Sequence, residues 1–177
     1  SYKQINQLRR IKPELPIAAF TATATNHTKE DIIKELELKR PEIHEASFVR
    51  ENIAYRIFKS EAKKRRIIEF CTTLPKSTGI IYCQTRKSVK EVSQLLNSEK
   101  ISCASYHGGM NREDREKAMN SWMEESSKIM VATNAFGMGI DKPNVRFVIH
   151  YEISESIEAY FQEAGRAGRD QKKAIAL

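Results

Sequence analysis

The stretch TGIIYCQT at residues 78–85 decides the fold, because it places a buried strand directly before a helix. It is a short apolar run opened by a glycine, and such runs are typical of strands buried on both faces of a parallel sheet. The next residues, RKSVKEVSQLLNSEK at 86–100, favour a helix. Their apolar residues recur at helical spacing: Val89, Val92, Leu95 and Leu96. A strand followed at once by such a helix predicts one half of a βαβ unit.

The same alternation continues toward the C-terminus. Strands are predicted in ISCASYHGG (101–109), KIMVATNAFGMG (128–139), RFVIHYE (146–152) and AIAL (174–177). Helices are predicted in NREDREKAMNSWMEES (111–126) and SIEAYFQEAGRAG (156–168). Strands that alternate with helices at this spacing favour a parallel sheet covered by helices on both faces, which is an α/β fold.

The N-terminal part of the chain has a different pattern. It presents a buried strand in LPIAAFTATAT (15–25), a helix in NHTKEDIIKELEL (26–38) capped by Asn26 or Thr28, and a third short element in HEASFV (44–49). Three elements are too few for a two-layer core of their own. We therefore expect three parts: residues 1–48 as the end of a preceding domain, residues 49–60 as a connection, and residues 61–177 as the main domain.

Composition indicates a globular protein with an anionic partner. Of the 177 residues, 40% are hydrophobic and 30% are charged, which supports a packed core. The net charge of +7 favours a polyanionic partner, nucleic acid first. No apolar run reaches the roughly 18 residues of a membrane span, so no membrane partner is expected. Cys71, Cys83 and Cys103 match no metal-binding spacing, so we expect no metal site and interpret them as reduced, buried thiols of a cytosolic protein.

Two arginines near the C-terminus, Arg166 and Arg169, each follow a glycine. The chain contains no Gly-Lys pair for a phosphate-binding loop and no Asp-Glu pair for magnesium, so it cannot hold a triphosphate by that route. The arginines would therefore act on a nucleotide bound mainly by something else. An arginine finger on a γ-phosphoryl group has this role and accelerates transfer by about 10³–10⁵. The alternative is a helix C-terminus, with Gly165 and Gly168 as caps.

The stretch VATNAFGMGIDKPNVRFVIHY (131–151) also has a pattern that suits ligand binding. It contains two polar residues, two glycines and an acid: Thr133, Asn134, Gly137, Gly139 and Asp141. The polar pair ends a strand, where α/β sheets present their ligand loops. The glycines leave backbone N–H groups open, and the acid suits a ribose hydroxyl or an arginine. The glycine pair with its acid and the two glycine-flanked arginines together make a more specific signal than either pattern alone.

Together these motifs resemble a known family. Residues 80–96, 131–151 and 159–170 resemble the fourth, fifth and sixth motifs of superfamily 2 helicases, in that order, and AFTATAT (19–25) resembles the third. The sequence FGMGIDKPNVRFVIHY together with YFQEAGRAGRD most resembles the RecQ family of ATP-dependent DNA helicases. Related RNA helicases of the DEAD-box type usually begin the sixth motif with histidine, where this chain has Gln162.

The resemblance implies roles for these residues around a nucleotide. Arg169 would be the arginine finger on the γ-phosphate, and Arg166 a second phosphate contact or a structural partner. Gln162 would sense or position the nucleotide. Nucleotide-binding roles would also fall to Gly137, Gly139 and Asp141, the acid contacting the ribose or an arginine of the sixth motif.

Other residues would face the nucleic acid or couple the two lobes of the motor. The fourth motif, Tyr82 to Arg86, would line the nucleic-acid side. Within the family pattern the backbone contacts would be Thr85, Arg86, Tyr106, His107, Gly108, Thr133 and Asn134, with Lys142 as a further phosphate contact. Thr21, Thr23 and Thr25 would relay the nucleotide state between lobes.

The implied fold is a second RecA-like lobe preceded by the tail of a first. ATP and Mg²⁺ would be bound mainly by a first RecA-like lobe that this sequence lacks, and no zinc is expected in this segment. The partners would be single-stranded and duplex DNA, unwound in the 3′-to-5′ direction in DNA repair and recombination, in the bacterial cytoplasm at the nucleoid or in the nucleus. The chain alone would not hydrolyse ATP. Two alternatives stay open: half of an RNA helicase, and a non-catalytic binding module that tolerates Arg169→Ala.

Four further residues have simpler interpretations. His107 is expected to contact a phosphate or a backbone carbonyl, and His150 to be a hydrogen-bonded core residue. Trp122 is expected in the core. Phe136 is assigned no function beyond packing its loop against the sheet.

Overall fold

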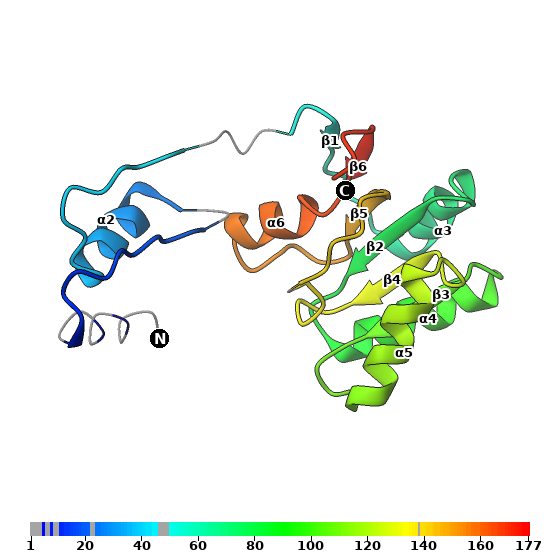
Figure 1. The fold of residues 1–177 in the computed structure, drawn as a ribbon. Helices are drawn as coiled ribbons and strands as arrows, with labels where there is room; N and C mark the ends of the chain where they lie inside the picture. Colours follow the sequence, from blue (N-terminus) through cyan, green and yellow to red (C-terminus); the bar gives the residue numbers. More distant parts are fainter. Residues whose placement is uncertain (1–4, 6–7, 9–10, 22–23, 46–49, 138) are drawn as a thin grey trace. The chain divides into compact units, whose positions relative to one another are not determined.

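The computed structural model describes residues 5, 8, 11–21, 24–45, 50–137 and 139–177. The chain forms two compact units, Ser1–Val49 and Arg50–Leu177 (Figure 1). No helix among the described residues is long and apolar enough to cross a membrane.

The second unit is built on one sheet. Within the described residues its strands are β1 (Ile53–Tyr55), β2 (Thr78–Tyr82), β3 (Cys103–Tyr106), β4 (Ile129–Ala132), β5 (Val145–His150) and β6 (Ala174–Ala176). Its helices are α3 (Lys63–Thr73), α4 (Arg86–Ser98), α5 (Arg112–Met123) and α6 (Ile157–Ala164). The strand order is β1-β6-β5-β2-β4-β3, and every neighbouring pair is parallel. The predicted α/β class and parallel sheet are confirmed.

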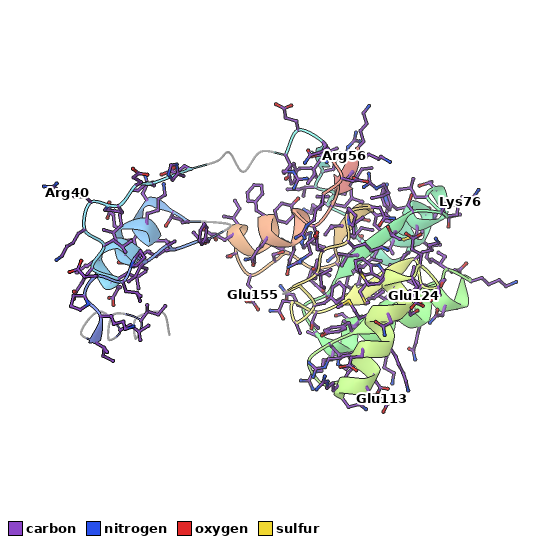
Figure 2. All side chains as sticks on the ribbon, viewed as in Figure 1. Arg40, Arg56, Lys76, Glu113, Glu124 and Glu155 are labelled. Carbon is purple, nitrogen blue, oxygen red and sulfur yellow. The ribbon has the colours of Figure 1, made fainter. Side chains whose placement is uncertain are left out.

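Helices cover both faces of this sheet, because alternate strand residues point to opposite sides. On one face, α3 and α4 bury Ile67, Val92 and Leu96 against strand residues that include Ile81 and Val131. On the other face, α5 and α6 bury side chains such as Trp122 and Ala164 against Ile80, Met130 and Val148. Charged side chains such as Lys76, Glu113 and Glu124 point outward from this unit (Figure 2).

Strand β2 is the centre of the sheet. All five of its residues are buried, as the glycine-opened apolar run predicted. Gly79 is required there, since a Cβ atom at this position would lie 2.1 Å from the ring of Phe147 on the neighbouring strand β5. The chain leaves β2 toward β4 and β3 on one side, and leaves β5 toward β6 on the other. In open α/β sheets, ligands bind at the carboxyl ends of the strands where the order reverses in this way.

Side-chain caps define where the helices begin. Thr85, Asn111 and Ser156 accept a backbone N–H bond at the start of α4, α5 and α6. In the first unit, α2 (Asn26–Glu35) is capped by Thr25, whose Oγ1 accepts from the Thr28 amide at 3.2 Å. The prediction of Asn26 or Thr28 as the cap is therefore wrong. Thr25 has the extended backbone that a cap requires, with φ −70° and ψ 165°.

The strand predicted at 15–25 is also wrong. Residues 15–21 and 24–25 have no regular secondary structure, and the Phe20 side chain is 94% exposed. A buried strand needs a neighbouring strand for its backbone groups, and the described residues of this unit contain none. In the third predicted element, His44 and Glu45 are irregular, and residues 46–49 lie outside the described part of the chain.

The segment expected as a connection contributes to the second unit. Within residues 49–60, strand β1 pairs in parallel with β6, and Ile53 faces Ala174. The Ala174 amide donates to the Asn52 carbonyl at 2.9 Å just before the strands pair. The edge of the sheet is thus made by residues that the sequence pattern assigned to neither domain.

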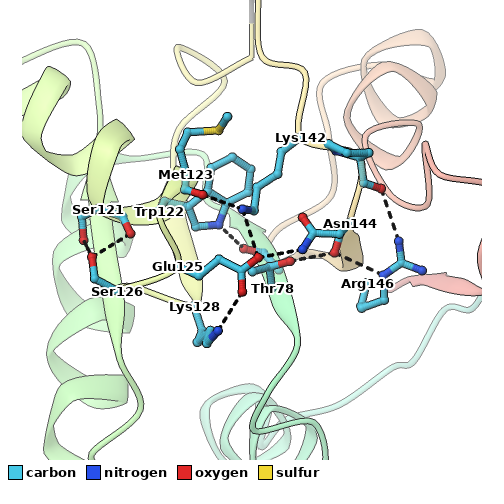
Figure 3. A network of polar contacts seen from close by, with 12 residues as sticks. Thr78, Ser121, Trp122, Met123, Glu125, Ser126, Lys128, Lys142, Asn144 and Arg146 are labelled. Carbon is cyan, nitrogen blue, oxygen red and sulfur yellow. Dashed lines mark hydrogen bonds and ion pairs between the residues drawn. The ribbon is translucent and has the colours of Figure 1, made fainter.

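A buried cation, Lys142, anchors the loop before β5 (Figure 3). Its side chain is 5% exposed, and its Nζ donates to the Met123 carbonyl at 2.9 Å and lies 3.4 Å from Glu125 Oε1. It also lies over the Trp122 ring, 5.4 Å from the centroid. Lys142 is therefore not available as a phosphate contact, and that prediction is wrong. The confirmed core position of Trp122, which is fully buried, creates the site that holds the lysine.

Glu125 compensates the charge of this lysine. Its carboxylate accepts from Lys128 at 2.8 Å and from Asn144 at 2.7 Å, besides its contact with Lys142. The Lys128 bond, with those from Asn144 and Lys142, lowers the pKa of Glu125 from 4.5 to about 2. A carboxylate whose pKa is lowered by folding stabilises the protein above its ordinary pKa, and this contribution is lost as the pH falls toward 2.

We predict that Glu125→Gln destabilises the second unit by about 1–3 kcal/mol at pH 7, because it leaves the Lys142 ammonium buried without its carboxylate. Urea unfolding of both proteins measures the difference. The gap should narrow as the pH falls from 4.5 toward 2, where the natural glutamate is itself protonated. The exposed neighbour Glu124→Gln is the matched control. Equal losses in the two variants would contradict the role of Glu125.

Candidate functional site

The carboxyl ends of three strands bring the predicted residues to one edge of the sheet, called here the carboxyl edge. Thr85 and Arg86 follow β2, and Tyr106, the last residue of β3, is followed by His107 and Gly108. Thr133 and Asn134 follow β4, and the Thr133 amide donates to the Tyr106 carbonyl at 3.1 Å. The edge continues into residues 133–141, called here the glycine loop, of which Met138 is outside the described residues.

Arg169 lies against the end of the glycine loop. Its Nη1 donates to the Ile140 carbonyl at 2.8 Å and to Asp141 Oδ1 at 2.9 Å. The arginine side chain is 35% exposed and the aspartate 82%. Nε and Nη2 have no protein partner within the described residues, so the guanidinium keeps donors for a ligand while one nitrogen holds it in place.

Arg166 packs under the same loop. A Cβ atom on Gly137 would lie 2.5 Å from Arg166 Nη2, so only glycine allows the guanidinium this close. Arg166 is half-buried, its Nε is buried without a hydrogen-bond partner, and no carboxylate pairs with it among the described residues. A half-buried cation without a counter-charge is costly and suits an anionic ligand.

A turn at residues 165–170 carries both arginines, and is called here the arginine turn. Gly165 caps α6 with φ −64°, so the helix ends before either arginine. Gly168 has φ +58°, and its amide donates to the Val145 carbonyl at 2.8 Å. Its carbonyl accepts from Arg50 Nη2 at 2.8 Å and Asn52 Nδ2 at 2.7 Å. Contacts from β5 and from the residues just before β1 thus hold the turn, and Arg50 and Asn52 were missed because they precede the arginine turn by more than a hundred residues.

The other predicted nucleotide residues are open to solvent. Gln162 is exposed on α6 and has no hydrogen bond within the described part of the chain. Gly139 has φ +75°, and a Cβ there would touch nothing within 4 Å. The described residues contain no group of three or more His, Cys, Asp or Glu that could hold a metal ion.

Tyr82 differs from its predicted place on the nucleic-acid side. It is only 4% exposed, and its hydroxyl donates to the Phe136 carbonyl at 3.0 Å, underneath the glycine loop. Phe136 itself is buried between Trp122 and Tyr106, with ring centroids 5.4 Å and 5.0 Å away, which confirms its packing role. His150 is confirmed as a hydrogen-bonded core residue through Nε2, which lies 3.0 Å from Glu163 Oε2.

A second part of the carboxyl edge is basic. Arg86 lies against Gly109, where a Cβ would be 2.4 Å from Arg86 Nη1, so this glycine lets the guanidinium reach across to the β3 loop. A groove beside it is lined by residues of α4 and by Ser105 and His107, and includes Lys87 and Lys90 but no acidic side chain. His107 Nδ1 is buried without a partner. Thr85 has a structural task as well, since it caps α4.

The threonines predicted to couple the lobes lie in the first unit. Thr25 caps α2, Thr21 lies in an irregular segment, and Thr23 is outside the described residues.

Comparison with known proteins agrees with this geometry. Residues 61–171 match the helicase conserved C-terminal domain. The chain is 42% identical over 173 residues to the ATP-dependent helicase SGS1 of Saccharomyces cerevisiae, covering 96% of this chain and 12% of that protein. It is 40% identical over 171 residues to the ATP-dependent DNA helicase RecQ of Bacillus subtilis, covering 96% and 29%. A protein of Acanthamoeba polyphaga mimivirus, named for ATP-dependent RNA helicase activity, is 42% identical over 174 residues, covering 98% and 32%.

Among solved structures, Saccharomyces cerevisiae Dbp5 bound to RNA and ADP BeF3 superposes with a TM-score of 0.75 at 24% identity, covering 97% of this chain and 47% of that one. This likeness shows the fold, a RecA-like helicase lobe. The match over residues 61–171 shows that the chain belongs to the family of helicase conserved C-terminal domains. Within that family it is a RecQ member, as the identity to RecQ helicases over almost its whole length shows. It spans between 12% and 32% of the curated relatives named above.

We predict that Gly168→Ala destabilises the second unit by about 1–3 kcal/mol, because alanine is strained at positive φ. Its Cβ would also lie 2.4 Å from Asn52 Nδ2 and 2.8 Å from the Lys172 carbonyl. Thermal unfolding measures the loss. Gly108→Ala is the matched control, since a Cβ there meets only Ala135 at 3.8 Å. A stable Gly168→Ala protein would show that the turn does not need its left-handed residue.

Proposed function

We propose that this chain is the part of an ATP-dependent DNA helicase that supplies the arginine finger and part of the nucleic-acid track. The single observation that carries the proposal is the arginine turn. It brings Arg166, which has no carboxylate partner in the described residues, and Arg169, which keeps free donors, against the glycine loop. Two guanidinium groups on that loop suit a γ-phosphoryl group.

The residues around the glycine loop provide only part of a nucleotide-binding site. The half-buried guanidinium of Arg166 and the open backbone at Gly139 suit phosphate oxygens. The sequence has no Gly-Lys pair for a triphosphate cradle, and the described residues contain no group of three or more His, Cys, Asp or Glu that could hold Mg²⁺. ATP and Mg²⁺ would therefore be bound mainly by a first RecA-like lobe. We further propose that residues 1–48 are the end of that lobe and that Thr21, Thr23 and Thr25 relay its nucleotide state.

During a cycle, ATP would draw the two lobes together and Arg169 would reach the γ-phosphate, with Arg166 beside it. Asp141 would orient Arg169 before the ligand arrives, as its 2.9 Å contact suggests. Hydrolysis would release the closure. Repeated closure would move the protein 3′-to-5′ along one strand and separate the duplex ahead, in the bacterial cytoplasm or the nucleus.

On the nucleic-acid side, Arg86 and the loop from Tyr106 to Gly108 would contact backbone phosphates without reading sequence. The groove beside Arg86 has cations and no acid, which supports this assignment. DNA is proposed as the substrate because the chain resembles RecQ DNA helicases over almost its whole length. RNA is the second candidate, favoured by the likeness to the mimivirus protein.

We predict that the 177-residue chain alone does not hydrolyse ATP. A chimera in which it replaces the aligned segment of the Bacillus subtilis RecQ relative should hydrolyse ATP when single-stranded DNA is added. In that chimera Arg169→Ala should lower kcat by about 10³-fold or more. The control is Arg112→Ala, an exposed arginine of α5 that pairs only with Glu116. Hydrolysis that survives Arg169→Ala would support the non-catalytic alternative.

We predict that Arg86→Gln weakens binding of single-stranded DNA to the same chimera and reduces the slope of log K against log salt by about 1. Fluorescence anisotropy at several salt concentrations measures both quantities. Lys76→Gln, an exposed cation distant from the carboxyl edge, is the control (Figure 2). An unchanged slope would remove Arg86 from the track. The same titrations with RNA of equal sequence decide between the two substrates.

A further inference from the structure

The hydroxyl of Tyr82 needs an explanation beyond packing. Tyr82 is the last residue of β2, a strand that is otherwise threonine, glycine and isoleucine, and its side chain is 4% exposed. Phenylalanine would fill the same space without placing a polar atom in the core. The tyrosine hydroxyl instead donates to the Phe136 carbonyl at 3.0 Å, in the middle of the glycine loop. It ties the end of the central strand to the backbone that presents Gly137.

The Arg166 guanidinium lies against the loop that this hydroxyl holds. A Cβ atom on Gly137, the residue after Phe136, would lie 2.5 Å from Arg166 Nη2. Burial raises the pKa of Tyr82, and the nearby positive charge of Arg166 opposes that rise. Arg166 has no carboxylate partner in the described residues, so the backbone at Gly137, next to the carbonyl that Tyr82 holds, is the surface against which its guanidinium packs.

The ring of Tyr82 is itself held from the side. The His150 ring stacks on it, with centroids 5.7 Å apart and planes 20° apart. His150 Nε2 then lies 3.0 Å from Glu163 Oε2 on α6, one turn before Arg166. Ser154 Oγ donates to the same carboxylate oxygen at 3.1 Å. The Tyr82 ring is therefore held from the side, and through His150 it is connected to Glu163 on α6, the helix that precedes the arginine turn.

We propose that Tyr82 is a positioning residue for Arg166: its hydroxyl fixes the Phe136 carbonyl, and with it the glycine loop against which this guanidinium packs and is aimed at a phosphate. The inference rests on the proposed function, because aiming matters only if Arg166 contacts a transferring phosphoryl group. Tyr82 itself touches no ligand and acts through Arg166. A contact that strengthens in the transition state changes kcat more than KM.

The test is Tyr82→Phe in the Bacillus subtilis chimera, which removes one oxygen and keeps the ring. We expect kcat for ATP hydrolysis to fall about tenfold, a KM for ATP within about twofold, and a melting temperature within a few degrees. The matched control is Tyr151→Phe, a half-buried tyrosine at the end of β5 whose hydroxyl has no hydrogen bond in the described residues. Its kcat should not change. A Tyr82→Phe enzyme with full kcat overturns the proposal.

A double-mutant cycle separates positioning from a structural role. If Tyr82 acts through Arg166, Tyr82→Phe should cost nothing further in an Arg166→Gln background. If the fold-losses of kcat in the two single variants multiply in the double variant, the proposal is overturned, even if each single variant is impaired. Arg169→Ala tests the proposed function separately from the role of Tyr82. If Arg169→Ala leaves hydrolysis intact, the proposed function fails. If Arg169→Ala abolishes hydrolysis but Tyr82→Phe does not change it, only the role of Tyr82 is rejected.

Discussion

The parallel pairing of β2 with β4 on one side and β5 on the other is the constraint on which the rest of the structure depends. It requires a strand buried on both faces, and it requires Gly79, because the Phe147 ring occupies the space of any larger residue. Parallel strands end at the same edge, so this pairing gathers the segments after β2, β4 and β5 into one place. The glycine loop and the basic groove both lie at that edge as a consequence.

Two cations with little solvent exposure, Lys142 and Arg166, differ in whether the protein itself compensates their charge. Lys142 lies near Glu125, donates to a carbonyl and covers an indole ring, so its charge is compensated within the protein. Arg166 has a phenol and a glycine surface beside it and no carboxylate in the described residues. Burial of a charge is tolerated when it is paired, and an unpaired one is a candidate for a ligand contact. Both residues lie within motifs for which the sequence predicted functional roles.

Much of the second unit could be predicted from local pattern. The apolar run of β2, the helical spacing of Val89, Val92 and Leu96, and the glycine-flanked arginines all depend on neighbours in sequence. The failures depend on distant contacts. The apolar stretch 15–25 was predicted to be a strand, but the described residues of its unit contain no strand with which it could pair. Lys142 was predicted to contact a phosphate, but Glu125 in the turn after α5 supplies a carboxylate for it. Tyr82 was predicted to line the nucleic-acid side, but its side chain points inward under the glycine loop.

The sequence by itself determined the α/β class, the order of the motifs and the helicase family, because periodicity and short motifs survive without knowledge of the fold. The tertiary structure decided which charges are available. It paired Arg169 with Asp141 across 28 positions, and among the described residues it left Arg166 without an acid. It also brought Arg50 and Asn52 onto the Gly168 carbonyl across 118 and 116 positions. A side chain is free or engaged according to what the folded backbone places within about 3 Å of it, and local sequence carries no record of that distance.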